Sequence, residues 1–344
     1  MCAVRTTTTL VRERNRDERV TAAQTAARSW ADTRLLVRVA QMYYGLKLTQ
    51  EQIGGRLGLS RFKVGRLLER AVNESIVRIE IVHPAARLVG LEETIATRHG
   101  LHAVVVADVV AGDDRAAESL ARDAVAGAAV RYLADLDPGG AIGVSWGRTM
   151  LEVARQLSPG WTRATEIIQL NGASSRSATP TRANEVVEQF GITARASIRL
   201  MPAPAVMGSA ELRRALEADP AVGDTLEAAR QAPVAVFSLG IPTPESVLVE
   251  SGFVSEADQE RLRKAGAVGD VLGRFLAADG SIALADLDER TVGLPLSALA
   301  DKRFAIGVAA GPGRGPIALA AIRARCVNVL VTDEATAEWL VAHG

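Results

Sequence analysis

The chain has 344 residues, of which 48% are hydrophobic and 23% charged, a composition typical of a soluble globular protein. A chain of that length is too long to fold around one small core, so two or three domains are expected. The net charge is zero but uneven: residues 1–87 hold 16 Lys and Arg against 8 Asp and Glu, so residues 88–344 hold the other 24 and 32. A front of net charge +8 and a body of −8 indicate that only the front meets a polyanion.

Cysteine and histidine are too sparse for a disulfide framework or a zinc site. The two cysteines, Cys2 and Cys326, are far apart, and the four histidines form no metal-ligand pattern. We therefore expect no metal and no cofactor. The N-terminus lacks the apolar stretch of a signal peptide, and no segment is apolar enough to span a bilayer, so we expect a cytoplasmic protein with no membrane partner.

The first 29 residues are polar and predict a flexible N-terminal tail. Six arginines lie in this segment, so a basic tail without a partner is an alternative explanation for part of the positive charge. Helical spacing of apolar residues begins after Trp30.

Two amphipathic helices are predicted in "LTQEQIGGRLGLSRFKVGRLLERA", residues 48–71. Thr49 with Gln52 forms a capping-box pattern, Gly58 fits a left-handed helix end, and Ser60 can cap the second helix. One face carries the apolar residues Ile53, Leu57, Val64, Leu67 and Leu68.

The second helix then leaves Arg61, Lys63 and Arg66 on its free face. A helix-turn-helix places such a helix in the major groove of DNA, where arginine can anchor phosphate and read guanine. An ordinary solvated basic helix is the alternative. The predicted DNA contacts are Thr49, Gln50, Ser60, Arg61, Lys63, Val64 and Arg66.

The alternating stretch "VRIEIV", residues 77–82, predicts a half-exposed strand, so a small β-element follows the helices. Residues 30–87 are therefore expected to form a winged helix-turn-helix DNA-binding domain, all-α apart from this strand. A helix over 88–98 would link it to the next domain.

Strand and helix signals alternate through residues 88–344. Short apolar strands between helices are typical of an α/β domain with a largely parallel sheet flanked by helices. The expected strands are 102–107, 141–146, 166–172, 232–240, 303–311 and 327–333, and the expected helices are 115–136, 148–157, 181–190, 256–264, 316–325 and 334–341.

Ligands of open α/β sheets bind at the carboxyl ends of the strands, where "GVSWGRT" lies. Its glycines allow close backbone approach, its hydroxyls can bind a ligand, and Arg148 opens a helix whose amides favour an anion. A phosphate cradle is the functional interpretation, and a glycine-rich packing turn is the alternative. The predicted contacts here are Gly143, Ser145, Trp146, Gly147, Arg148 and Thr149.

Other strand ends carry similar residues. Asp270 could accept hydrogen bonds from sugar hydroxyls or simply cap a helix or turn, and Arg314 lies among glycines ahead of a helix. The further predicted effector contacts are Gly172, Ala173, Ser174, Arg182, Asn184, Gly240, Asp270 and Arg314.

The stretch "RVAQMYYGLKLTQEQIGGRLGLSRFKVGRLLERAVNESIVRIEIVHP" resembles the winged helix-turn-helix of SorC-type sugar-binding transcriptional regulators. "IGVSWGRTM", "LNGASS", "GDVLGRFLAADG" and "VNVLVTDEATAEWL" resemble motifs of that family's effector domain, in the same order. The resemblance covers residues 33–341. It implies an operator-binding regulator, a small sugar or sugar-phosphate effector and a homo-oligomer, expected to be a tetramer.

There are departures from the family pattern. Gly54 and Gly65 stand where family members often have Ala or a small polar residue, and Arg314 aligns with a common Lys, which leaves the identity of the effector open. The effector domain also resembles sugar-phosphate isomerases and deaminases. An enzyme using Asp270, Asp333 or Glu334 as acid or base is therefore an alternative, as is a DNA-architectural protein with a degenerate pocket.

Overall fold

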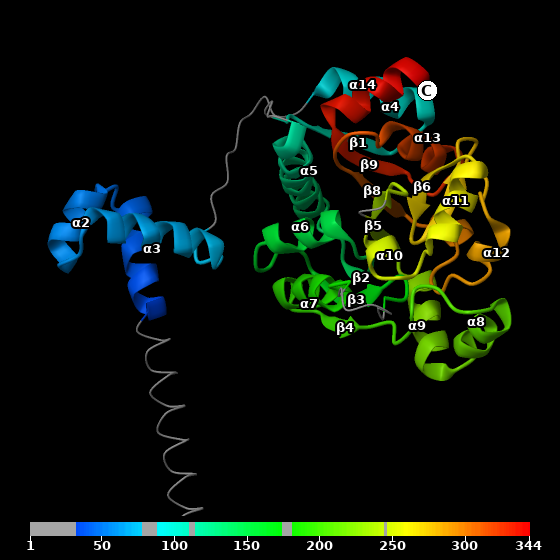
Figure 1. Ribbon diagram of the computed structural model, residues 1–344, viewed down its shortest axis with the longest axis horizontal. Helices are drawn as coiled ribbons and strands as arrows, with labels where there is room; N and C mark the ends of the chain where they lie inside the picture. The colour runs from blue at the N-terminus through cyan, green and yellow to red at the C-terminus, as the bar shows by residue number, and fades with distance from the viewer. Residues whose placement is uncertain (1–31, 78–87, 110–113, 174–180, 244–245) are drawn as a thin grey trace, which may run out of the picture. The chain divides into compact units, whose positions relative to one another are not determined.

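The computed structural model describes residues 32–77, 88–109, 114–173, 181–243 and 246–344. The chain divides into two compact units, with the division between Val82 and His83. The described part of the first unit is helical, and the second is an α/β unit (Figure 1). The predicted tail, residues 1–29, and the predicted strand at 77–82 lie outside the described residues, apart from Val77.

The helical unit contains the predicted pair of helices. Residues 32–40 are helical and continue into a π-helical segment, η1 (Gln41–Gly45), followed by α2 (Gln50–Leu57) and α3 (Arg61–Asn73). Thr49 and Gln52 form the predicted capping box, and Gly58 ends α2 in the left-handed region at φ 66°. The Ser60 hydroxyl accepts the Lys63 amide and caps α3. These local predictions are confirmed.

Apolar side chains from each of these segments form the core of the helical unit, with Val39, Met42, Ile53, Val64 and Leu68 buried. The turn after α2 lies close to Gly54, where an added Cβ would lie 2.5 Å from the Leu59 carbonyl oxygen. Gly54, which stands where family members often have Ala, is thus required by the tight turn between α2 and α3.

The α/β unit is built on a parallel sheet with the strand order β1-β9-β8-β5-β2-β3-β4. A hairpin of β6 and β7 pairs antiparallel with the end of β5. The predicted α/β class with a parallel sheet is confirmed, and every predicted strand of this unit is present. The strands are β1 (Ala103–Ala107), β2 (Gly140–Val144), β3 (Ala164–Gln169), β4 (Ser197–Arg199), β5 (Val234–Gly240), β6 (Ala267–Val271), β7 (Arg274–Ala277), β8 (Phe304–Ala309) and β9 (Val329–Asp333).

Helices cover both faces of this sheet (Figure 1). Successive residues of one strand point to opposite faces, so Val105 packs toward α5, α6 and α7, whereas Val104 and Val106 pack toward α4, α13 and α14. This two-sided burial explains the continuous apolar strands. The helices are α4 (Val89–His99), α5 (Asp114–Leu136), α6 (Arg148–Gln156), α7 (Ala183–Ala194), α8 (Ala210–Glu217), α9 (Pro220–Gln231), α10 (Val247–Glu250), α11 (Glu256–Lys264), α12 (Ala285–Asp288), η2 (Leu296–Leu299), α13 (Gly315–Arg323) and α14 (Glu334–His343). Within the described ranges, no helix is both long and apolar enough to cross a membrane.

The winding of the sheet reverses between β2 and β5, which are neighbours. From β2 the chain proceeds outward through β3 to β4, and from β5 it proceeds the other way through β8 to β9. The loops that follow two such strands lead in opposite directions, and this leaves a crevice at the carboxyl ends of the strands. The fold therefore places a ligand site beside the ends of β2 and β5.

Candidate functional site

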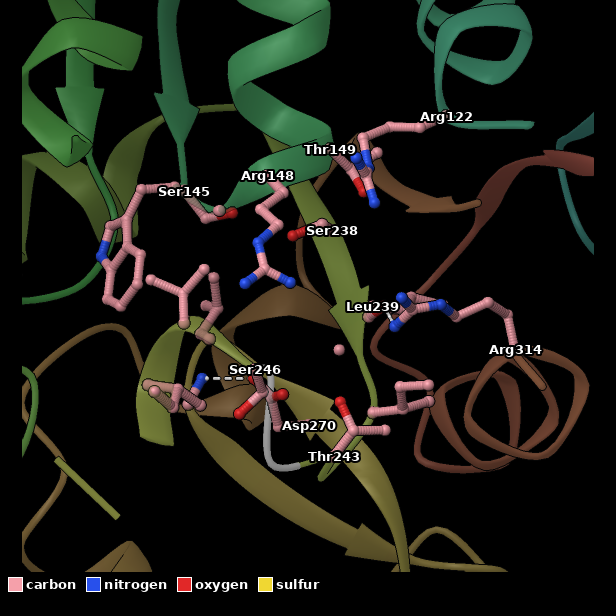
Figure 2. A pocket seen from close by; sticks show the side chains of 18 of the residues that line it. Arg122, Ser145, Arg148, Thr149, Ser238, Leu239, Thr243, Ser246, Asp270 and Arg314 are labelled. Carbon is pink, nitrogen blue, oxygen red and sulfur yellow. Dashed lines mark hydrogen bonds between the residues drawn. The ribbon is translucent and has the colours of Figure 1, made fainter. Parts of the chain in front are cut away.

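A cavity of about 330 Å³ lies at this switch point, large enough for a small metabolite. It is bounded by residues that end or follow β2, β3, β5 and β8, and by the β6–β7 hairpin (Figure 2). Helix α5 adds two side chains. The lining residues are Glu118, Arg122, Ser145, Trp146, Gly147, Arg148, Thr149, Asn171, Ser238, Leu239, Gly240, Ile241, Thr243, Ser246, Val247, Leu248, Asp270, Leu272, Gly273, Pro312 and Arg314.

The N-terminus of α6 forms one wall of the cavity. Gly147 precedes it with φ 137°, a conformation that favours glycine, and no side chain among the described residues caps the helix. An added Cβ at Gly147 would lie 3.2 Å from the Ser238 hydroxyl. Uncapped amides at a helix start carry partial positive charge, so this wall suits an anion.

Arg148 is the first residue of α6, and its side chain points into the cavity (Figure 2). Its guanidinium lies 2.8 Å from a Glu250 carboxylate oxygen. Both side chains are about two-fifths exposed, so this ion pair is weak and open to competition. An anionic ligand at the α6 terminus would compete with Glu250 for Arg148.

Arg314 approaches the cavity from the loop after β8 (Figure 2). Its side chain is largely buried and donates to the carbonyl oxygens of Ala310 and Leu239 at 3.1 and 3.2 Å. Burial lowers the pKa of this guanidinium, and Glu118, 3.9 Å away, opposes that effect. Arginine remains charged in proteins, so a fixed cation lies beside the cavity.

Asp270 lies on β6 with its carboxylate facing the cavity (Figure 2). One oxygen accepts the Gly273 amide at 3.0 Å, the turn contact considered as the alternative to a ligand contact. Burial raises the pKa of this carboxyl to about 6, against the opposing effects of that amide and of Arg314. Gly240 permits this position, because a Cβ there would lie 2.0 Å from a carboxylate oxygen.

Asn171 supplies a buried acceptor that nothing in the described residues satisfies. Asn171 is 3% exposed and lines the cavity. Its Oδ1 has no hydrogen-bond partner among the described residues. A buried polar atom without a partner is unfavourable, so a ligand hydroxyl or amine at this position would be stabilised.

Eight of the predicted effector residues meet at the cavity, from four separate parts of the chain. They are Ser145, Trp146, Gly147, Arg148, Thr149, Gly240, Asp270 and Arg314.

The other predicted residues do not line it. At Gly143 a Cβ would lie 2.3 Å from Leu170, so this glycine serves packing inside the sheet. The carbonyl of Gly172 accepts the Trp146 indole at 3.1 Å, so this residue supports the wall. Ala173 is buried in a neighbouring apolar cluster, and Ser174 lies outside the described residues.

Two polar residues predicted to contact the effector also lie outside the cavity lining. Arg182 is exposed and pairs with Glu185 on its own helix at 2.6 Å, and Asn184 is exposed beside it. Sequence reasoning missed Glu118 and Arg122, which form a 2.7 Å ion pair within α5, because nothing in a helical i, i+4 pair signals a distant site. Asn171 and Ser238, by contrast, lie at strand ends: Asn171 follows β3, and Ser238 is among the last residues of β5.

The helical unit presents the predicted basic face. Arg61, Lys63 and Arg66 are exposed on α3, whereas Arg70 pairs with Glu74 at 2.6 Å. Thr49 and Ser60, whose hydroxyls cap α2 and α3, are exposed residues, and Gln50 is half-buried.

One predicted DNA contact requires correction. Val64 is fully buried in the core of the helical unit, so its side chain cannot reach a base edge.

The carboxylates considered for an enzyme do not gather at the cavity. Asp333 caps α14 through the Thr336 amide at 2.8 Å and also accepts the Gly311 amide at 2.7 Å. Glu334 is absent from the cavity lining, so Asp270 alone of the three faces it.

Comparison with known proteins identifies the family. Residues 83–342 match the Sugar-bind family model, described as "Putative sugar-binding domain". The deoxyribonucleoside regulator of Bacillus subtilis (strain 168) is 31% identical over 307 residues, covering 89% of this chain and 97% of that protein. The transcriptional regulator LsrR of Enterobacter sp. (strain 638) is 31% identical over 314 residues, covering 90% and 93%. The crystal structure of the full-length sorbitol operon regulator SorC from Klebsiella pneumoniae aligns with a TM-score of 0.65 at 25% identity, covering 90% of this chain and 99% of that one. The chain belongs to the SorC-type family of sugar-binding transcriptional regulators.

Proposed function

We propose that this regulator binds operator DNA through a winged helix-turn-helix within residues 30–87 and that a small sugar phosphate in the α/β unit, taken as residues 88–344, controls that binding. Helix α3 would enter the major groove and present Arg61, Lys63 and Arg66. Thr49, Gln50 and Ser60 lie at or beside the starts of α2 and α3, where they suit phosphate contacts.

One observation gives the strongest support for a phosphorylated effector. The uncapped start of α6, Arg148 and Arg314 face the same cavity. Two guanidinium groups and a helix N-terminus together favour a phosphate. Asp270, Asn171 and Ser145 would receive the hydroxyl groups of the attached sugar. The volume of about 330 Å³ fits a monosaccharide phosphate.

Regulation requires that effector and DNA prefer different arrangements of the protein, because a ligand with equal affinity for both shifts nothing. A helix-turn-helix usually binds paired half-sites as a dimer. We therefore propose a homo-oligomer, with a tetramer as the expected form.

A thermal-shift screen of the full chain against sugar phosphates and the corresponding free sugars tests the proposal. A phosphate compound at a hundredfold excess over its Kd should stabilise the α/β unit by about 2.7 kcal/mol. Arg148→Ala should abolish this shift. Arg155→Ala is the matched control, because Arg155 lies on the same helix, outside the cavity lining, and pairs only weakly with Glu152 at 3.7 Å. Stabilisation by a free sugar alone would show that the phosphate assignment is wrong.

A further inference from the structure

Phe62 is a large apolar side chain that is highly exposed to solvent. It is 85% exposed, more than any other large hydrophobic residue in the described part of the chain. An aromatic ring has about 150–250 Å² of surface to bury, so such exposure is unfavourable unless a partner covers it. Phe62 occupies the second position of α3, directly after the capping Ser60 and Arg61.

The geometry of α3 places this ring on the face that the core leaves free. Val64, Leu68 and Ala71 are buried on the opposite side of the helix. Phe62 and Arg66 are four residues apart, so their Cβ atoms are neighbours about 5–6 Å apart on one surface. The N-terminal residues of a recognition helix are those that reach base edges.

The positive charge around the Phe62 ring indicates which kind of partner it contacts. Arg61, Lys63 and Arg66 are exposed, and no ion pair joins them to another described residue. The acidic residue of α3, Glu69, lies seven residues beyond Phe62, about two turns along the helix. Three cations around an exposed ring disfavour a cationic protein partner and favour a polyanion that also carries apolar groups.

The major groove of DNA meets this description, because the C5-methyl of thymine is its one apolar group. We propose that Phe62 reads a thymine methyl in the operator, one or two base pairs from the bases that Arg66 contacts. The inference rests on the proposed entry of α3 into the major groove. It adds a specificity residue of different chemistry from the arginines, since the ring discriminates by methyl contact rather than by hydrogen bonds.

The test starts from duplexes selected from a randomised library with the full-length protein. Each thymine of a selected duplex is then replaced singly by deoxyuridine, which removes the methyl and keeps the base pairing. Affinities are measured at one salt concentration for the parent, Phe62→Ala and a control, Val72→Ala. Val72 is also apolar and exposed on α3, but it lies ten residues farther along, about 15 Å away.

At one thymine position per half-site, deoxyuridine should weaken binding by the parent and by Val72→Ala about fourfold, the effect of one buried methyl group. Phe62→Ala should bind the thymine duplex more weakly and should not distinguish thymine from deoxyuridine. Equal affinity of the parent for every deoxyuridine duplex would overturn the inference, as would unchanged discrimination by Phe62→Ala.

Two outcomes separate this inference from the proposed function. Sequence-selective binding by the parent without any deoxyuridine effect would reject the methyl contact while retaining DNA binding by α3. Failure to enrich any duplex would reject both. Sedimentation of Phe62→Ala adds a check: a smaller assembly than the parent's would assign the ring to a contact between copies of the chain and overturn the inference.

Discussion

Replacement of Asp270 by Asn should remove a pH dependence of stability that the buried carboxyl causes. The pKa of Asp270 is raised from 3.8 to about 6 by burial, so the folded state binds its proton more tightly than the unfolded state. The stabilisation is fully present below pH 3.8 and is lost as the pH rises through 6. A shift of about 2.2 units corresponds to about 3 kcal/mol over the whole window, of which about 1.3 kcal/mol falls between pH 5 and pH 7.

Urea unfolding followed by tryptophan fluorescence measures this effect in the relevant unit, because three of the four tryptophans, Trp146, Trp161 and Trp339, lie in the α/β unit. The free energy of unfolding of Asp270→Asn relative to the parent should rise by about 1.3 kcal/mol from pH 5 to pH 7. Asn retains an oxygen for the Gly273 amide, so the variant should fold. If this difference in unfolding free energy did not change with pH, or changed in the opposite direction, the argument that burial raises the pKa of Asp270 would be refuted.

Two further predictions follow from close contacts. Gly54→Ala should destabilise the helical unit by about 1–3 kcal/mol, because its Cβ would meet the Leu59 carbonyl at 2.5 Å, whereas Gly55→Ala, with no atom within 4 Å, should stabilise it by about 0.5–1 kcal/mol. Thermal unfolding followed by circular dichroism distinguishes the pair, and equal effects would contradict the contact. Glu250→Gln should free Arg148 from its 2.8 Å ion pair and tighten binding of the sugar phosphate found in the thermal-shift screen several-fold by calorimetry. Unchanged or weaker binding would show that Glu250 does not compete with the ligand.

Local patterns predicted the framework well, because each depends on a few adjacent residues. The capping of α2 by Thr49 and of α3 by Ser60 follows from hydrogen bonds within one turn, and the sequence displays both. The strands of the sheet are buried on both faces, so their apolar runs are visible without any knowledge of partners. The strand-end motif at Ser145–Thr149 was found in the same way.

The features that escaped prediction depend on long-range packing. Glu118 and Arg122 reach the cavity from the flank of α5, and their spacing is that of any surface ion pair. The hairpin β6–β7 has no alternating pattern, because Gly269 and Asp270 are selected by their close approach to β5. Gly143 and Gly172 resembled ligand-binding glycines, but only the positions of Leu170 and Pro204 reveal that they serve packing.

Control of DNA binding by the cavity is tested most directly by the affinity of the full-length protein for a selected duplex, measured with and without the sugar phosphate that gives the largest thermal shift. The affinity should change by at least about fivefold in the parent and in Arg155→Ala, and should not change in Arg148→Ala. An affinity that the bound effector leaves unchanged in the parent would contradict the proposed coupling between the cavity and the helix pair.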